Sequence, residues 1–235
     1  MKITSNFDSG NIQFVSFDAS KNTFKLKIRK DTHSDFFQWF HFRLTGAAGQ
    51  KCKLMIMNAG ASTYPEGWVN YKVCASYDRD EWFRVPTTFR NGVLTIDFKP
   101  THNSVYFAYF APYSYDRHLD LIHEAQMSDE VNMEIIGKTV QGRDIEMLRV
   151  GRPSRQKKVI WVIARQHPGE SMTEWFVEGF LQRLLDEHDP VSRTLLREAV
   201  FYVVPNMNID GAIAGNLRAN AAGANLNREW QRPSK

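Results

Sequence analysis

Residues 157–170 read KKVIWVIARQHPGE. Every position from 159 to 164 is apolar, a pattern that suits a parallel strand covered on both faces. A lysine pair precedes this run, as at a solvated strand end, and the tetrapeptide His167-Pro168-Gly169-Glu170 follows it closely. The stretch therefore predicts a strand whose carboxyl end leads into a loop with an imidazole and a carboxylate.

Two downstream segments place this strand in a sheet. Apolar residues recur at helical spacing over residues 172–185, and a second apolar run covers residues 199–204. The order strand, helix, strand predicts a parallel α/β sheet with a right-handed crossover. A third predicted strand of this sheet covers residues 145–150.

The upstream part of the chain has a different pattern. Short runs of alternating apolar residues are separated by turn residues, which is typical of an all-β sandwich. Asn91-Gly92 predicts a tight hairpin turn, because both residues tolerate positive φ. We predict a β-sandwich over residues 1–115, a connecting helix over 116–127 and an α/β domain over 128–235. The predicted strands of the sandwich are residues 12–17, 24–28, 36–44, 51–57, 71–76, 93–98 and 105–110.

Composition indicates a soluble, folded chain. Of 235 residues, 43% are hydrophobic and 24% are charged, and the net charge is +4 with scattered basic residues. These values favour a globular protein over a disordered, membrane or nucleic-acid-binding one. The first residues lack the order of a secretory signal, so we expect a cytoplasmic protein. Cys52 and Cys74 lie in strand-like segments, and we expect two buried free thiols rather than a disulfide.

His167 and Glu170 are candidate metal ligands. They follow the carboxyl end of a strand, which is where open α/β sheets bind ligands. An imidazole and a carboxylate three residues apart can converge on one ion, and this pair of donors suits zinc. The alternative is that Glu170 stabilises the amino-terminal end of the next helix beside a loop histidine.

A second polar segment follows the strand at residues 199–204. It reads PNMNIDG at 205–211, GNLR at 215–218 and GANLNREW at 223–230. Its Asn and Gly residues could serve only as turn formers, but this does not explain two arginines held among small residues. Asp210 we interpret as structural, because Asp-Gly after a strand is usually a turn.

These motifs, in this order and spacing, resemble those of the M14 metallocarboxypeptidases, and most closely the cytosolic carboxypeptidase branch. The upstream stretches FQWFHFR (37–43) and YFAPYSY (109–115) also resemble that branch. The resemblance implies that His167 and Glu170 bind one Zn²⁺. It implies that Arg218 polarises the scissile carbonyl and stabilises the oxyanion, and that Asn227 and Arg228 bind the terminal carboxylate of the substrate.

The expected activity is hydrolysis of the C-terminal peptide bond of a peptide or protein. The family's third zinc ligand, a histidine, and its general-base glutamate are expected beyond Lys235, so we expect the α/β domain to be truncated and the chain to be incomplete for catalysis. One alternative is a zinc amidohydrolase of the aspartoacylase or succinylglutamate desuccinylase type. Another is a non-catalytic β-sandwich interaction protein. We expect no nucleic-acid or membrane partner, and the sequence leaves the oligomeric state open.

Overall fold

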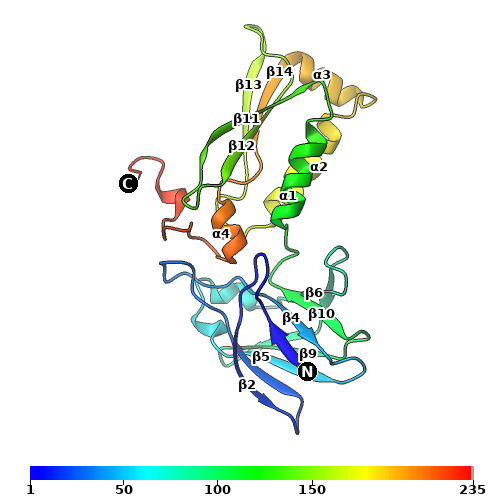
Figure 1. Cartoon of the computed structure of the whole chain (residues 1–235), viewed down its shortest axis with the longest axis vertical. Coiled ribbons are helices and arrows are strands. Elements are labelled where there is room, and N and C mark those ends of the chain that lie inside the picture. The colour runs from blue at the N-terminus through cyan, green and yellow to red at the C-terminus, as the bar shows by residue number, and fades with distance from the viewer. Residues whose placement is uncertain (234–235) are drawn as a thin grey trace.

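A computed structural model describes residues 1–233 and shows two parts stacked end to end (Figure 1). The amino-terminal part contains strands and short 3₁₀ helices, and the other part combines a sheet with helices. Ser234 and Lys235, which close the predicted domain 128–235, lie outside the described residues.

The amino-terminal part is a β-sandwich of two five-stranded sheets. Large apolar side chains from both sheets, such as Phe24 and Leu54 on one and Phe42 and Phe107 on the other, fill a shared core. This fits the alternating pattern, in which every second residue faces inward. One sheet has the order β1 (Lys2–Thr4), β4 (His41–Thr45), β10 (Ser104–Ala108), β6 (Val73–Ser76) and β7 (Phe83–Val85). The other has the order β2 (Gln13–Asp18), β3 (Thr23–Lys27), β5 (Cys52–Ile56), β9 (Val93–Phe98) and β8 (Thr87–Arg90).

The predicted hairpin at Asn91-Gly92 is confirmed. β8 and β9 pair antiparallel, with Arg90 opposite Val93, so the connection has two residues. Asn91 and Gly92 have φ values of 50° and 76°, as this turn requires. The two cysteines are free and buried, as expected.

The second part contains a mixed four-stranded sheet with helices on one face (Figure 1). β13 and β14 pair parallel, whereas β12 pairs antiparallel with both of its neighbours. Apolar side chains of the helices, including Leu121 and Leu181, pack on Leu148 and Val203 of the sheet. The sheet order is β11 (Val131–Lys138), β12 (Asp144–Val150), β14 (Ala199–Val204) and β13 (Lys158–Ile163). The helices are α1 (Tyr115–Ala125), α2 (Met172–Leu184) and α3 (Pro190–Glu198).

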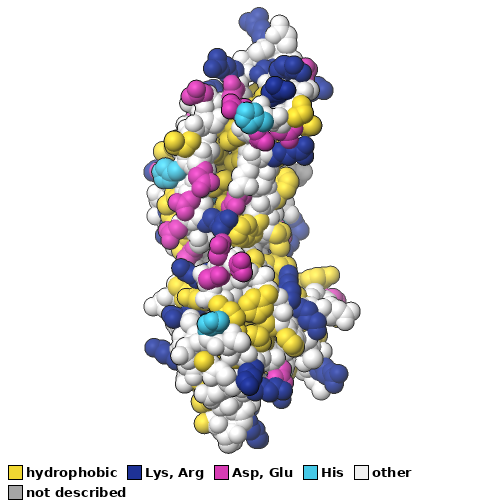
Figure 2. Space-filling view, turned by 90° about the vertical axis from the view of Figure 1, so that its right-hand side faces the viewer, with side chains coloured by type: hydrophobic (Ala, Val, Ile, Leu, Met, Phe, Trp, Pro, Cys, Tyr) yellow, Lys and Arg dark blue, Asp and Glu magenta, His cyan; other side chains and the backbone are white. Residues whose placement is uncertain are grey.

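β13 is an edge strand, and the described residues cover only one of its faces. Ile160 and Val162 pack against the helices, whereas Val159, Trp161 and Ile163 remain 60%, 58% and 44% exposed. No described helix or strand lies over the second face, so within residues 1–233 the apolar run is covered on one face only. On the face shown in Figure 2, acidic and basic side chains are interspersed over the α/β part. Within residues 1–233, no helix is long and apolar enough to cross a membrane.

The carboxyl ends of β13 and β14 point toward the β-sandwich (Figure 1). The short helix α4 (Ile209–Ala214) follows β14 at the junction, and the chain then runs past it to the 3₁₀ helix η3 (Leu226–Arg228). The loop from β13 to α2 starts at the same edge. The fold thus places both polar segments of the sequence at the junction of the two parts.

Candidate active site

The loop between β13 and α2, residues 164–171, is anchored by a buried arginine. Arg165 has a positive φ of 48° and is 2% exposed. Its Nε donates to the carbonyl oxygen of Pro168 at 2.9 Å, and its Nη1 lies 2.5 Å from Oε2 of Glu174 on α2. Because these contacts join the start of the loop to Pro168 and to α2, they restrict the direction in which the loop presents His167 and Glu170.

His167 and Glu170 face each other. Nδ1 of His167 lies 3.0 Å from Oε1 of Glu170, and Nε2 of His167 lies 3.1 Å from Oδ1 of Asn225. The same Oδ1 accepts a hydrogen bond from the backbone amide of Asn227 at 3.2 Å, which identifies it as the acceptor end of the amide. Nε2 of His167 must therefore carry the hydrogen, and in the neutral ring the lone pair lies on Nδ1, toward Glu170.

This arrangement fits a shared cation. Nδ1 of His167 and the carboxylate oxygen of Glu170 each direct a lone pair toward the other atom. Two lone pairs repel each other at this distance, so a proton or a metal ion must lie between the two atoms. Zinc binds nitrogen and carboxylate oxygen at about 2.0–2.2 Å, which separates two tetrahedral ligands by about 3.3 Å. The observed 3.0 Å is close to that separation. Among residues 1–233 no third His, Cys, Asp or Glu completes a group of three, so the described residues supply two donors.

Two backbone contacts place the Arg218 segment beside this loop. The backbone amide of Met207 donates to Ala164 at 3.0 Å, and that of Gly169 donates to Leu217 at 2.9 Å. Gly211 of α4 packs so closely on Pro168 that a Cβ there would lie 2.6 Å from the proline ring, and a side chain would not fit. The two polar segments predicted from the sequence are therefore in contact.

The predicted substrate residues lie in this second segment. Arg218 is half-buried, and its guanidinium carbon lies 5.7 Å from the centre of the Phe36 ring. Asn227 and Arg228 are exposed on η3, and Nη1 of Arg228 donates to the carbonyl oxygen of Asn227 at 3.1 Å. η3 follows Asn225 directly, so Asn227 and Arg228 lie close in sequence to the residue that contacts His167. The substrate-binding and catalytic roles of Arg218, Asn227 and Arg228 remain predictions from the sequence.

Asp210 connects α4 to the hairpin between β11 and β12. Its carboxylate accepts hydrogen bonds from the Thr139 hydroxyl at 3.0 Å, from the Gln141 amide at 2.8 Å and from Arg143 at 2.6 Å. These three hydrogen bonds attach α4 to the β11–β12 hairpin, which supports the interpretation of Asp210 as structural.

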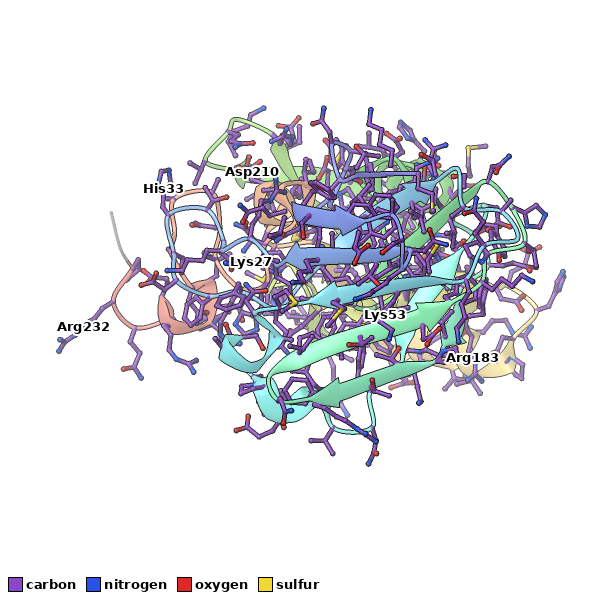
Figure 3. The ribbon with its side chains drawn as sticks, turned by 90° about the horizontal axis from the view of Figure 1, so that it is seen from below. Lys27, His33, Lys53, Arg183, Asp210 and Arg232 are labelled. Carbon is purple, nitrogen blue, oxygen red and sulfur yellow. The ribbon has the colours of Figure 1, made fainter. Side chains whose placement is uncertain are left out.

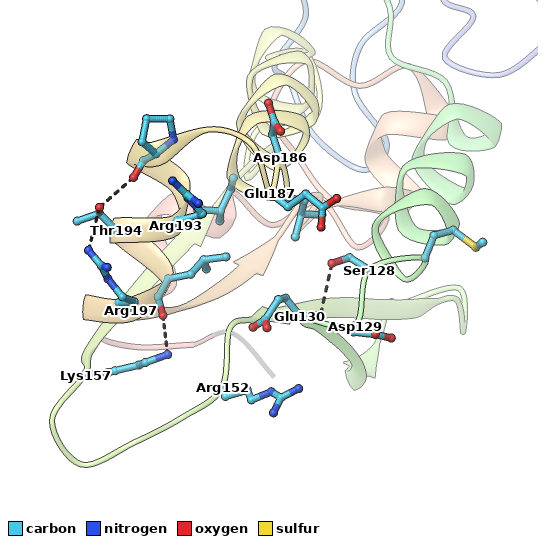
Figure 4. A pocket seen from close by; sticks show the side chains of 15 residues that line it. Ser128, Asp129, Glu130, Arg152, Lys157, Asp186, Glu187, Arg193, Thr194 and Arg197 are labelled. Atoms are coloured by element: carbon cyan, nitrogen blue, oxygen red, sulfur yellow. Dashed lines mark hydrogen bonds between the residues drawn. The ribbon is translucent and has the colours of Figure 1, made fainter.

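A cleft near the other end of α2 is distinct from this site. It has a volume of about 1140 Å³ and is lined by the carboxyl end of α2, by α3 and by the loops near Glu130 and Lys157 (Figure 4). His167 precedes the amino end of α2, so the cleft lies at the opposite end of that helix. Its basic side chains include Arg193 and Arg197 of α3, and its acidic side chains come from the turns at residues 129–130 and 186–187 (Figure 4).

Comparison with known proteins decides the family. Residues 117–234 match the family model described as zinc carboxypeptidase, peptidase family M14, and residues 3–110 match that of the cytosolic carboxypeptidase N-terminal domain. The chain belongs to the M14 zinc carboxypeptidase family. Its two parts correspond to the β-rich leading domain and to an α/β carboxypeptidase domain with a mixed sheet, as the motifs predicted.

The M14 relatives are longer than this chain. An uncharacterized protein of Zymomonas mobilis is 49% identical over 234 residues, covering 100% of the chain and 60% of the relative. Mouse cytosolic carboxypeptidase 6 is 31% identical, covering 97% of the chain and 46% of the relative. The crystal structure of a metallo-carboxypeptidase from Burkholderia cenocepacia is 50% identical with a TM-score of 0.96, covering 99% of this chain and 63% of that one. A metallo-carboxypeptidase from Pseudomonas aeruginosa, in complex with (2-guanidinoethylmercapto)succinic acid, is 46% identical with a TM-score of 0.95, covering 100% and 62%. The chain thus spans about half to two-thirds of these proteins.

Sequence reasoning about the M14 motifs missed three residues that shape the site. Asn225 was part of a quoted motif but had no assigned role, although it contacts His167. Arg165 stands directly after an apolar strand, and a charge in a buried position there could have been a signal. Asp31, in the β-sandwich, gave no signal, because its contacts are with residues 217–219.

Proposed function

We propose that the intact protein is a zinc-dependent metallocarboxypeptidase that hydrolyses the C-terminal peptide bond of peptides or proteins. The observation that carries this proposal is the pairing of Nδ1 of His167 with Oε1 of Glu170, while Asn225 holds Nε2. Membership of the M14 family supports it. His167 and Glu170 would hold one Zn²⁺.

Each residue of the site has a task in this proposal. When bound, zinc polarises the carbonyl and lowers the pKa of a coordinated water. Asn225 fixes the tautomer and the ring orientation of His167, which keeps Nδ1 available as a donor. The fixed positive charge of Arg218 would polarise the scissile carbonyl and stabilise the oxyanion that forms on it.

Asn227 and Arg228 would bind the terminal carboxylate of the substrate. A guanidinium offers a planar fork of donors that matches a carboxylate, and Asn227 can add an amide donor. The exposure of both side chains leaves them accessible to a ligand. The Pseudomonas aeruginosa relative was crystallised with a succinic acid derivative, a dicarboxylate, which is consistent with carboxylate recognition in that protein. The names of the curated relatives support a cytoplasmic location for this protein.

A peptidase assay of the intact protein tests the function. The substrates are blocked peptides with a free C-terminal carboxylate, the same peptides with a C-terminal amide, and N-acyl amino acids. We expect the free acids to be cleaved much faster than the amides, loss of cleavage with a chelator, and recovery with zinc. Preferential hydrolysis of N-acyl amino acids would favour the aspartoacylase type instead. Absence of cleavage in every case would favour a non-catalytic protein.

A further inference from the structure

A carboxylate of the β-sandwich binds three consecutive backbone amides of the Arg218 segment. Asp31 is 4% exposed and accepts hydrogen bonds from the amides of Leu217, Arg218 and Ala219, at 2.6, 2.7 and 2.8 Å. Hydrogen bonds from backbone amides to a carboxylate are strong because the acceptor is charged. Three of them at successive residues fix the backbone from which the side chain of Arg218 extends.

The rest of the loop at residues 31–36 supports the same segment. The backbone amide and the hydroxyl of Thr32 donate to Oδ1 of Asn216, at 3.0 and 3.2 Å. A Cβ on Gly223 would lie only 2.4 Å from the carbonyl oxygen of His33, so the two backbones touch. Figure 3, seen from the β-sandwich end, shows His33 beside the C-terminal segment. The loop is itself closed by a hydrogen bond from the amide of Asp31 to the carbonyl of Phe36 at 2.8 Å.

Phe36 contacts the side chain of Arg218, whereas Asp31 binds its backbone. The guanidinium carbon lies 5.7 Å from the ring centre, within the range of a cation–π interaction. An arginine side chain has several rotatable bonds, and a backbone clamp alone leaves them free. Contact with the Phe36 ring restricts the positions that the guanidinium group can adopt. The loop at residues 31–36 therefore holds both the backbone and the guanidinium group of Arg218.

We propose that Asp31 and Phe36 are positioning residues for Arg218, so that the β-sandwich forms the wall of the active site that holds the oxyanion-stabilising charge in place. This inference rests on the proposed function of Arg218. It gives the leading domain a direct role in the reaction, in addition to its own folded core.

Substitutions in the intact protein test this role. Asp31→Asn keeps the size of the side chain but loses the negative acceptor, and Asp35→Asn is the matched control. Asp35 lies in the same loop, is exposed, and accepts a hydrogen bond from Nζ of Lys30 at 2.6 Å. We expect Asp31→Asn to speed amide hydrogen exchange at residues 217–219 and to lower kcat by about 10- to 100-fold, with a smaller change in KM. Asp35→Asn should leave both unchanged.

A second pair of variants separates the side-chain contact from the backbone clamp. Phe36→Leu should lower kcat without changing exchange at residues 217–219, because the three amide hydrogen bonds remain. Phe36→Tyr keeps the aromatic face and should restore activity. If Asp31→Asn does not fold, these two variants still decide the role of the loop.

A double variant shows whether the effect passes through Arg218. In an Arg218→Ala background, Asp31→Asn should lower kcat no further, since nothing is left to position. Equal losses in both backgrounds, or a folded Asp31→Asn protein with wild-type kcat, would overturn the positioning role while leaving the carboxypeptidase proposal intact. Failure of the wild type to cleave any C-terminal peptide bond would overturn the proposed function, and this role with it.

Discussion

Arg165 and Glu174 form an ion pair from which solvent is excluded. Nη1 of Arg165 lies 2.5 Å from Oε2 of Glu174, and the two side chains are 2% and 0% exposed. Glu174 also accepts hydrogen bonds from Asn206 at 3.0 Å and from Nδ1 of His118 at 2.9 Å. This network lies behind the loop that carries His167 and connects it to β14 and α1.

Removal of Arg165 should destabilise the protein strongly. Arg165→Met removes the arginine from the buried Glu174 carboxylate, and breaking a buried ion pair in this way typically costs about 3–5 kcal/mol. Urea unfolding measures the loss. Arg183→Met is the control, because its ion pair with Asp189 lies at the surface and should contribute little. Similar free energies of unfolding for the two variants would contradict the structural role of the buried pair.

The stability of the protein should fall at high pH because of His118. Burial opposes protonation of this imidazole, but hydrogen bonds and charges from Glu146 and Glu174 outweigh it and raise the pKa of His118 to about 9. The folded-state pKa thus exceeds the unfolded value of about 6.5. The contribution of the protonated ring is complete below about pH 6.5 and is lost as the pH rises through about 9, and it amounts to the order of 3 kcal/mol.

Urea unfolding of the wild type at about pH 6.5 and about pH 10 measures that fall. His118→Gln should reduce the difference between the two conditions, whereas His123→Gln, an exposed histidine on the same helix, should retain it. Glu174 also pairs with Arg165, so the histidine and the arginine share this carboxylate. An unchanged pH dependence in His118→Gln would contradict this assignment.

Asn225 should control zinc affinity without touching the ion. Asn225→Leu removes the acceptor for Nε2 of His167, so the ring can rotate or protonate at Nδ1. Loss of such a hydrogen bond to a metal-binding histidine typically weakens metal binding by about 10- to 100-fold. Asn225→Asp retains an acceptor and should bind zinc nearly as the wild type does. Competition with a chelator gives both affinities, and equal weakening by the two variants would count against the tautomer argument.

The strands and the helix next to the His167 loop could be predicted because their patterns are local. The apolar runs at β13 and β14, the helical spacing of α2 and the Asn91-Gly92 turn each need only neighbouring residues. β11 was missed although Val131, Met133 and Ile135 alternate with polar residues, and it is mostly exposed in the structure. α3 was missed because it is short and polar after Pro190.

For the site, the sequence predicted the two candidate metal ligands but not the residues that orient them. The spacing of His167 and Glu170 pointed to a shared ion, but the orientation of the imidazole depends on Asn225, which is far away in the sequence. The amide clamp of Asp31 depends on docking of the β-sandwich against residues 217–219. No local pattern encodes a contact between such distant segments, so these residues emerge only from the tertiary structure.

Arg228 should discriminate between free and amidated substrates. Arg228→Ala should raise KM and lower kcat/KM for peptides with a free terminal carboxylate by roughly 10- to 100-fold, the effect of losing a charge-assisted pair. Cleavage of amidated peptides, where measurable, should hardly change. Arg232→Ala, an exposed arginine in the same segment (Figure 3), is the control. Equal losses on both substrates would contradict carboxylate binding by Arg228.

Anomalous scattering from crystals of the intact protein grown with zinc tests the shared metal site most directly. Data collected above and below the zinc absorption edge locate the ion independently of the protein density. We predict one zinc peak at about 2.0–2.2 Å from both Nδ1 of His167 and a carboxylate oxygen of Glu170. In the same crystals, Nε2 of His167 should still donate to Asn225. Zinc bound through Nε2, or a peak that contacts neither His167 nor Glu170, would contradict the account.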